Sequence, residues 1–214
     1  MTSVVVCGSA RRLVQPDRAI LALGLSVVAK DAATALDQVA ASSTQLSDIL
    51  DAAGIRAADR TTDGVGVAEE WEWRKDTNTL VGYRASTAVS IVLTDLSLIA
   101  PLLREAVGTS SAQVRGLTWQ VDADNPAHHE LLGEAARDAR RRATAYVEAL
   151  GLSLGNVELI SETPIAAGDP RGDVVAQSAP MMMKARGGAA EVAVQPGQIE
   201  LSSEVHVRFA VLPG

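Results

Sequence analysis

The chain has 214 residues, of which 47% are hydrophobic and 21% are charged, a composition typical of a folded globular protein with a substantial core. Its net charge of -7 argues against general binding to nucleic acid, which depends on Lys and Arg contacts to phosphate, so we expect no nucleic-acid partner. Only 3% of residues are aromatic, so the core must consist of Val, Leu, Ile and Ala.

The single cysteine, Cys7, cannot form an internal disulfide, and its place in an apolar run favours a buried structural thiol over a reactive one. No charged segment followed by an apolar stretch opens the chain. No apolar run approaches the roughly 20 residues of a membrane span. As written, the sequence predicts a cytoplasmic protein with no membrane span.

Hydrophobic periodicity predicts the elements of the first half of the chain. Strands are expected over 4–10 and 19–28, and Gly24 inside the second indicates a bulge or a close neighbour. A helix capped by Asp31 runs to about residue 53. Two strands within 65–93 then flank a polar turn, which predicts a hairpin.

The second half contains the most regular helix, 126–150, which follows Asn125 as N-cap and ends before Gly151. Its apolar stripe is mostly alanine, which lets a helix approach a sheet closely. The expected stripe is Leu131, Ala135, Ala139, Ala143, Tyr146 and Leu150. The other expected elements are a helix at 95–107, with Pro101 as a feature against it, and strands at 113–121, 157–162 and 199–211.

The order ββαββαβαββ predicts an α+β fold, with a mainly antiparallel sheet and helices packed on one face. We expect one domain over 1–214. It contains a long loop at 163–197 that is rich in Pro, Gly and Met, and loops of this length are usually functional or disordered.

No stretch shows a catalytic constellation, and we expect no catalytic residue, no cofactor and no metal. No serine lies in a Gly-x-Ser-x-Gly elbow. His128 and His129 are adjacent, so they diverge on a helix, and His206 lies on the outward face of the last strand. The arginines at 137 and 140–142 are interpreted as a solvated face with Glu134 and Asp138 as partners, not as an anion site.

Two features are candidates for an interaction surface. Trp71 and Trp73 lie in a hairpin whose acidic residues also allow acid/base chemistry or an aromatic platform for a sugar, although a structural hairpin is favoured. Methionine is common at adaptable contact surfaces, and the long loop contains the run Met181, Met182 and Met183. This run would contact either another subunit or a partner protein, or it would dock on its own subunit.

Several motifs in order across the chain resemble the SIMPL domain family, whose bacterial members include periplasmic immunogenic proteins. They are Val5-Val6-Cys7-Gly8, Pro16-Asp17, Leu50-Asp51-Ala52-Ala53-Gly54-Ile55, Gly82-Tyr83-Arg84-Ala85-Ser86, Ala149-Leu150-Gly151-Leu152-Ser153-Leu154-Gly155 and Pro196-Gly197-Gln198-Ile199-Glu200. The resemblance implies an α+β domain that oligomerises, in some members into ring- or channel-like assemblies, and an association with oxidative or envelope stress. It implies no catalytic residues, and this chain departs from the exported members by showing no signal peptide.

The leading hypothesis is a non-enzymatic, homo-oligomeric assembly or binding protein of the bacterial cytoplasm with a stress-related role. The first alternative is a small-ligand binder or enzyme with a pocket between the 65–93 hairpin and the 163–197 loop. The second is an adaptor for a protein partner in a stress response.

Overall fold

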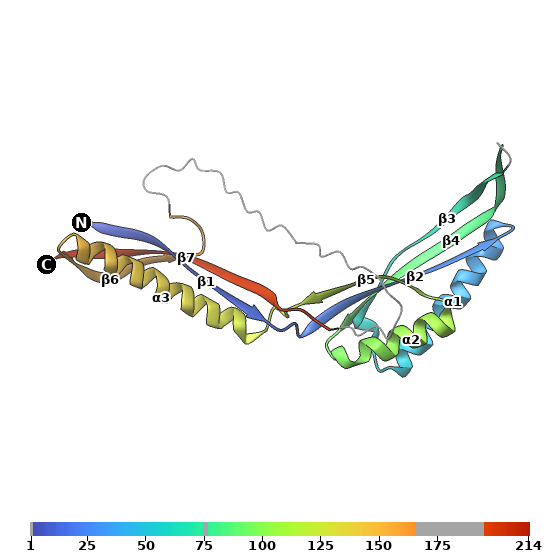
Figure 1. Cartoon of the computed structure of the whole chain (residues 1–214), viewed down its shortest axis with the longest axis horizontal. Helices are drawn as coiled ribbons and strands as arrows, with labels where there is room; N and C mark the ends of the chain where they lie inside the picture. The colour runs from blue at the N-terminus through green and yellow to red at the C-terminus, as the bar shows by residue number, and fades with distance from the viewer. Residues whose placement is uncertain (1, 75–76, 166–194) are drawn as a thin grey trace. The chain divides into compact units, whose positions relative to one another are not determined.

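The computed structural model describes residues 2–74, 77–165 and 195–214 of the chain (Figure 1). The elements are β1 Ser3–Val14, β2 Arg18–Ala29, α1 Ala32–Ala52, β3 Arg60–Arg74, β4 Thr77–Leu93, α2 Ile99–Ser110, β5 Gln113–Gln120, α3 Pro126–Ala149, β6 Leu152–Ser161 and β7 Ile199–Pro213. The α+β class with antiparallel pairing is confirmed, but the strands divide between two sheets. They belong to two compact units, while a single domain over 1–214 stays a prediction.

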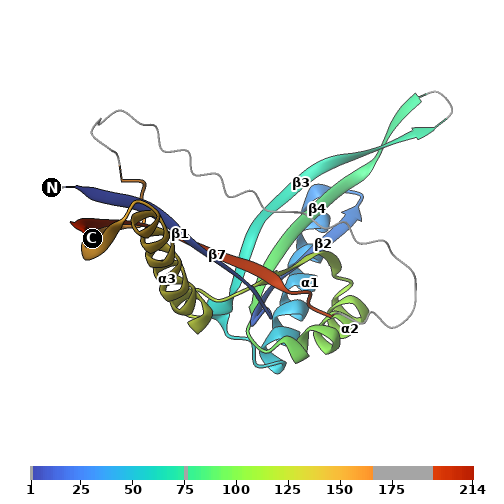
Figure 2. The same cartoon turned by 60° about the vertical axis from the view of Figure 1, so that its left-hand side comes forward.

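Unit 1 is a three-stranded antiparallel sheet of order β1-β7-β6 with α3 on one face (Figure 2). The last strand of the chain is its central strand and pairs with the first, placing Val6 opposite Val207. Strand alternation turns every second residue of β1 and β7 toward α3. The buried core is small and consists of Val6, Ala135, Ala139, Ala143, Val205, Val207 and Phe209.

The alanine stripe of α3 packs directly on the backbone of β1. A Cβ added at Gly8 would collide with the carbonyl oxygen of Ala135 and the amide nitrogen of Ala139, so glycine is required by the close approach of helix and strand. The stripe continues to Val147, which is 2% exposed. Tyr146 and Leu150 are 62% and 74% exposed, so their expected burial is wrong.

Other expectations for unit 1 fail at the level of single residues. Cys7 is only half-buried, because alternation places its neighbours Val6 and Gly8 under α3 and turns Cys7 to the opposite face, where it pairs with His206. Strand β6 starts at Leu152, earlier than expected, because it pairs with the end of β7.

Unit 2 is a four-stranded antiparallel sheet of order β3-β4-β2-β5, with α1 and α2 packed on one face (Figure 1). Its core is rich in large aliphatic side chains from both layers. The residues that are at most 2% exposed in this core include Leu21, Leu23, Leu25, Leu46, Leu50, Ile91, Leu93, Ile99 and Leu102.

Local signals define the helix ends of this unit. The Asp31 side chain accepts the backbone N–H of Thr34 at 2.9 Å, and Gly54 follows α1 with φ +74°. Pro101 lies in the first turn of α2, where backbone N–H groups have no intrahelical partner, so it does not interrupt the helix.

Candidate functional site

The β3–β4 hairpin extends beyond the rest of its sheet, as Figure 1 shows. Strand β2 pairs with β4 only as far as Tyr83, whereas β3 follows β4 to its first residue. The part that has no third strand comprises residues 70–74 and 77–82, and we call it the projecting ribbon. A two-stranded ribbon alone is marginally stable in water.

Large apolar side chains are exposed on the projecting ribbon. Trp71 and Trp73 are 50% and 68% exposed, and Leu80 pairs across the strands with Trp71. The indole N–H of Trp71 donates to Glu69 at 3.2 Å. Both tryptophans named from the sequence are therefore exposed, and their role as an interaction surface stays a prediction.

Charge at the base of the ribbon is largely paired. The Arg84 guanidinium donates through Nε to Glu70 at 2.8 Å and through a second nitrogen to the same carboxylate. These hydrogen bonds, and the positive charge, lower the pKa of Glu70 from its ordinary value. A carboxylate held ionised in this way is unsuited to act as a general acid near neutral pH.

The second surface is the face of the unit 2 sheet opposite the helices. Small residues that alternate with the buried residues of β2 and β4 form this face, including Ala22, Gly24, Ser86, Ala88 and Ser90. A depression of about 510 Å³ lies on this face, and both Asp63 and Arg115 line it. The depression is shallow and largely open to solvent.

Two β-bulges place the charged residues of the depression. In β3, Asp63 and Gly64 together oppose the single residue Ala88, and Gly64 has φ +125°. In β5, Arg115 is the extra residue between the partners of Ala22 and Leu23. Bulges re-aim side chains and are common beside functional sites.

Arg115 reaches across the sheet because Gly24 leaves room for it. A Cβ at Gly24 would collide with Nε of Arg115. The close neighbour that Gly24 indicated in the sequence is therefore this side chain. On the opposite side, Ser90 Oγ donates to Asp63 at 2.6 Å.

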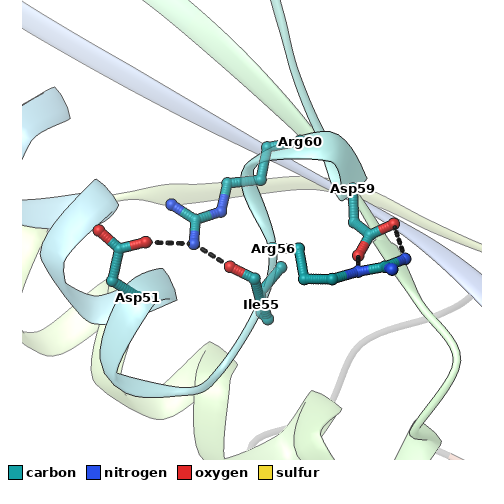
Figure 3. Close-up of polar contacts among 5 residues, drawn as sticks. All are labelled: Asp51, Ile55, Arg56, Asp59 and Arg60. Carbon is teal, nitrogen blue, oxygen red and sulfur yellow. Dashed lines mark hydrogen bonds and ion pairs between the residues drawn. The ribbon is translucent and has the colours of Figure 1, made fainter.

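A third polar cluster joins the end of α1 to the start of β3 (Figure 3). Arg60 donates to Asp51 at 2.6 Å and to the carbonyl of Ile55. Arg56 and Asp59 form a bidentate ion pair, in which two guanidinium nitrogens donate to the two carboxylate oxygens at 2.7 and 2.9 Å. These hydrogen bonds raise the pKa of Arg56 and lower that of Asp59. Both sets of contacts lie at a chain connection and tie neighbouring residues together, so the cluster is interpreted as structural.

In unit 1 the arginines of α3 are partly paired. Asp138 accepts the backbone N–H of Ser9 at 3.1 Å and pairs with Arg141 and Arg142 at 2.9 and 2.7 Å. The Ser9 bond and the two arginines lower the pKa of Asp138. Glu134 instead pairs with Arg12 of β1, a partner that local helix spacing could not indicate.

The other features named from the sequence are the methionine run and the candidate metal ligands. Met181, Met182 and Met183 lie outside the described residues. Within the described part, no group of three or more His, Cys, Asp or Glu residues is arranged for a metal ion. Sequence reasoning missed Asp63 and Arg115, for which the only signal was Gly24.

The fold and these surfaces define an α+β protein of two helix-covered antiparallel sheets. Residues 4–209 match the SIMPL family, described as a protein of unknown function (DUF541), and the chain belongs to this family. The match confirms the resemblance seen in the sequence motifs.

Relatives of the chain carry no assigned activity in their names. The 26 kDa periplasmic immunogenic protein of Brucella melitensis biotype 1 is 29% identical over 183 residues, 78% of this chain and 72% of that protein. The uncharacterized protein YggE is 30% identical in Edwardsiella ictaluri, over 72% of this chain and 65% of the relative. YggE of Escherichia coli K12 is 28% identical, over 69% of this chain and 62% of the relative. The chain thus spans just under two thirds of these YggE proteins.

One solved structure is only remotely similar. A hydantoinase/carbamoylase family amidase from Burkholderia ambifaria has a TM-score of 0.26 and 18% identity, over 58% of this chain and 34% of that chain. A likeness this weak says nothing about function.

The expected cytoplasmic location is wrong. It is contradicted by the Brucella relatives, from B. melitensis and B. abortus, which are named as periplasmic proteins. Export signals are removed from mature proteins, so the opening residues of a chain are a poor guide to its compartment. Among the described helices, none has the length and apolar character needed to cross a membrane.

Proposed function

We propose that this SIMPL protein is a non-enzymatic assembly and binding protein that associates with further copies of itself through the projecting ribbon. The observation that carries the proposal is the exposure of Trp71 and Trp73 on a two-stranded extension. Tryptophan is enriched among the residues that dominate binding energy at protein interfaces.

A second copy is the occupant that the ribbon favours. Strand β3 is an edge of its sheet, so its outer backbone groups are available for pairing. Each copy offers the same edge and the same indoles, so two ribbons form a self-complementary contact. Such a contact would also cover a ribbon that is marginal in isolation.

The experiment compares the mass of the full chain in solution with that of a Trp71→Ser/Trp73→Ser variant, by native mass spectrometry and light scattering at micromolar concentration. We expect an oligomer for the wild type and a monomer for the variant. Tyr146→Ser is the matched control, because Tyr146 is an aromatic side chain equally exposed on α3, and it should leave the mass unchanged.

A monomeric wild type contradicts self-assembly. An oligomer that survives the double substitution contradicts the ribbon as the contact surface. A different protein bound at fixed stoichiometry would instead favour the adaptor role.

A stress-related role follows from the family resemblance alone and is part of the proposal. Its test is survival of a deletion strain after peroxide treatment, complemented with the wild type or the ribbon variant. Equal survival of the deletion and parent strains would contradict it.

A second candidate function, binding of a small ligand, is favoured by the depression lined by Asp63 and Arg115.

A further inference from the structure

We propose that the depression on the open face of the unit 2 sheet binds a small zwitterion of the α-amino acid class, with its carboxylate on Arg115 and its ammonium group on Asp63. This inference is independent of self-assembly, because the depression lies on the sheet face and not on the projecting ribbon.

Arg115 differs from the neighbouring arginines in its charge pairing. Three arginines belong to strand positions on this face. Arg18 pairs with Asp122 at 3.1 Å and Arg84 pairs with Glu70. Arg115 forms no ion pair with any described residue, although a bulge and a glycine place it across the sheet. A positioned guanidinium of this kind is a good receptor for a carboxylate.

Asp63 is held in position at the depression by its neighbours. Its carboxylate accepts from Ser90, which fixes one oxygen and leaves further lone pairs for another donor. The bulge that carries it is braced by the Thr87 hydroxyl, which donates to the carbonyl of Gly64 at 2.8 Å. The Asp63 carboxylate is thus a fixed hydrogen-bond acceptor at the other end of the depression.

The two charged side chains reach the depression from nearby positions of the sheet. Arg115 crosses Gly24, and Asp63 contacts Ser90, which lies one strand and two residues away. Strand spacing and rise place the backbones at Gly24 and Ser90 roughly 8 Å apart. Both side chains line the one depression, so a short zwitterion can contact both. An α-amino acid, with one carbon atom between its charged groups, is the smallest zwitterion of this kind.

The floor of the depression between the two charges consists of small side chains. Ala22, Ser86 and Ala88 present at most a methyl or hydroxymethyl group there. A flat floor lets a small ligand lie close to the sheet, and serine can add a hydrogen bond. Because Asp63 and Arg115 are both exposed, we expect weak binding, with a dissociation constant of about 1 mM.

The test is ligand-observed saturation-transfer NMR on the full chain with three probes. Glycine carries both charges, N-acetylglycine only the carboxylate and glycinamide only the ammonium group. We expect saturable binding of glycine, and binding at least about tenfold weaker for each of the other two. Hydrogen exchange should show protection by glycine at residues 63–66 and 113–116.

The matched variants are Arg115→Gln and Asp63→Asn, with Arg104→Gln on the exposed side of α2 as control. Each site variant should weaken glycine binding about tenfold, and the control should not change it. Circular dichroism shows whether each variant is folded, and the probe series in the wild type tests the proposal even if one is not.

Three results would overturn the inference. One is the absence of saturable glycine binding, and another is equal binding by wild type and Arg115→Gln. The third is equal binding of glycine and N-acetylglycine, which would mark a simple anion site. None of these results depends on the oligomeric state, so the proposed assembly stands or falls separately.

Discussion

The two units solve the same packing problem, a helix layer on an antiparallel sheet, with opposite means. Unit 2 fills the space between its layers with large side chains such as Leu21, Leu50 and Ile99. Unit 1 nearly removes that space, because alanines of α3 lie against the backbone of β1 at Gly8. The comparison teaches that stability in unit 2 depends on buried volume, whereas in unit 1 it depends on the closeness of two backbones.

The largest effect should come from a cavity in unit 2. Leu21 is fully buried, so Leu21→Ala should reduce the free energy of unfolding by about 4 kcal/mol. All three tryptophans of the chain, at 71, 73 and 119, are in this unit, so denaturant unfolding followed by tryptophan fluorescence reports it selectively.

Val207→Ala is the corresponding substitution in unit 1. It should reduce the free energy of unfolding by about 2 kcal/mol, because fewer buried atoms are lost. Hydrogen exchange of α3 reports that loss. Equal costs for the two substitutions would break the distinction between the units.

An added methyl group should be the sharpest probe of unit 1. Gly8→Ala forces β1 and α3 apart and should cost about 3 kcal/mol, measured by hydrogen exchange of both elements. Gly133→Ala is the matched control, since its added Cβ meets only the flexible end of Arg137. It should stabilise α3 by about 0.5 to 1 kcal/mol through helix propensity. A neutral Gly8→Ala would show that the helix and strand can separate freely.

These outcomes bear on what sequence can reveal. Periodicity and caps gave α1 and α3 nearly to the residue, because Asp31, Asn125 and Gly151 act on the chain beside them. The division into two sheets was missed because the pairing of Val6 with Val207 joins the two ends of the chain. The Asp63–Arg115 depression was missed because it too depends on residues that are far apart in the sequence. The bulges of β3 and β5 border one depression only when β4 and β2 are paired between them.

The smallest expected effect is on the stability of the fold at acidic pH. The pKa of Asp138 is lowered in the folded state by the Ser9 N–H and by Arg142 and Arg141. Its contribution to stability is therefore complete above the unfolded pKa and is lost as pH falls through the folded pKa, from about pH 5 downward.

Asp138→Asn should flatten this part of the stability profile of unit 1, measured by hydrogen exchange between neutral and acidic pH. Asp48→Asn, on the exposed side of α1 in the other unit, should leave the unit 1 profile unchanged. A wild-type slope in the Asp138 variant would contradict the assignment.

The position of β7 has a consequence for how the protein is made. Strands β1 and β6 both pair with β7 and not with each other, and β7 follows all the other described elements in the sequence. Unit 2 has its elements in one continuous stretch, so it can fold while synthesis continues. Strand β1 precedes the other described elements but has no partner in its sheet until β7 has been synthesised. Until then the backbone groups of β1 are unpaired and need protection from aggregation.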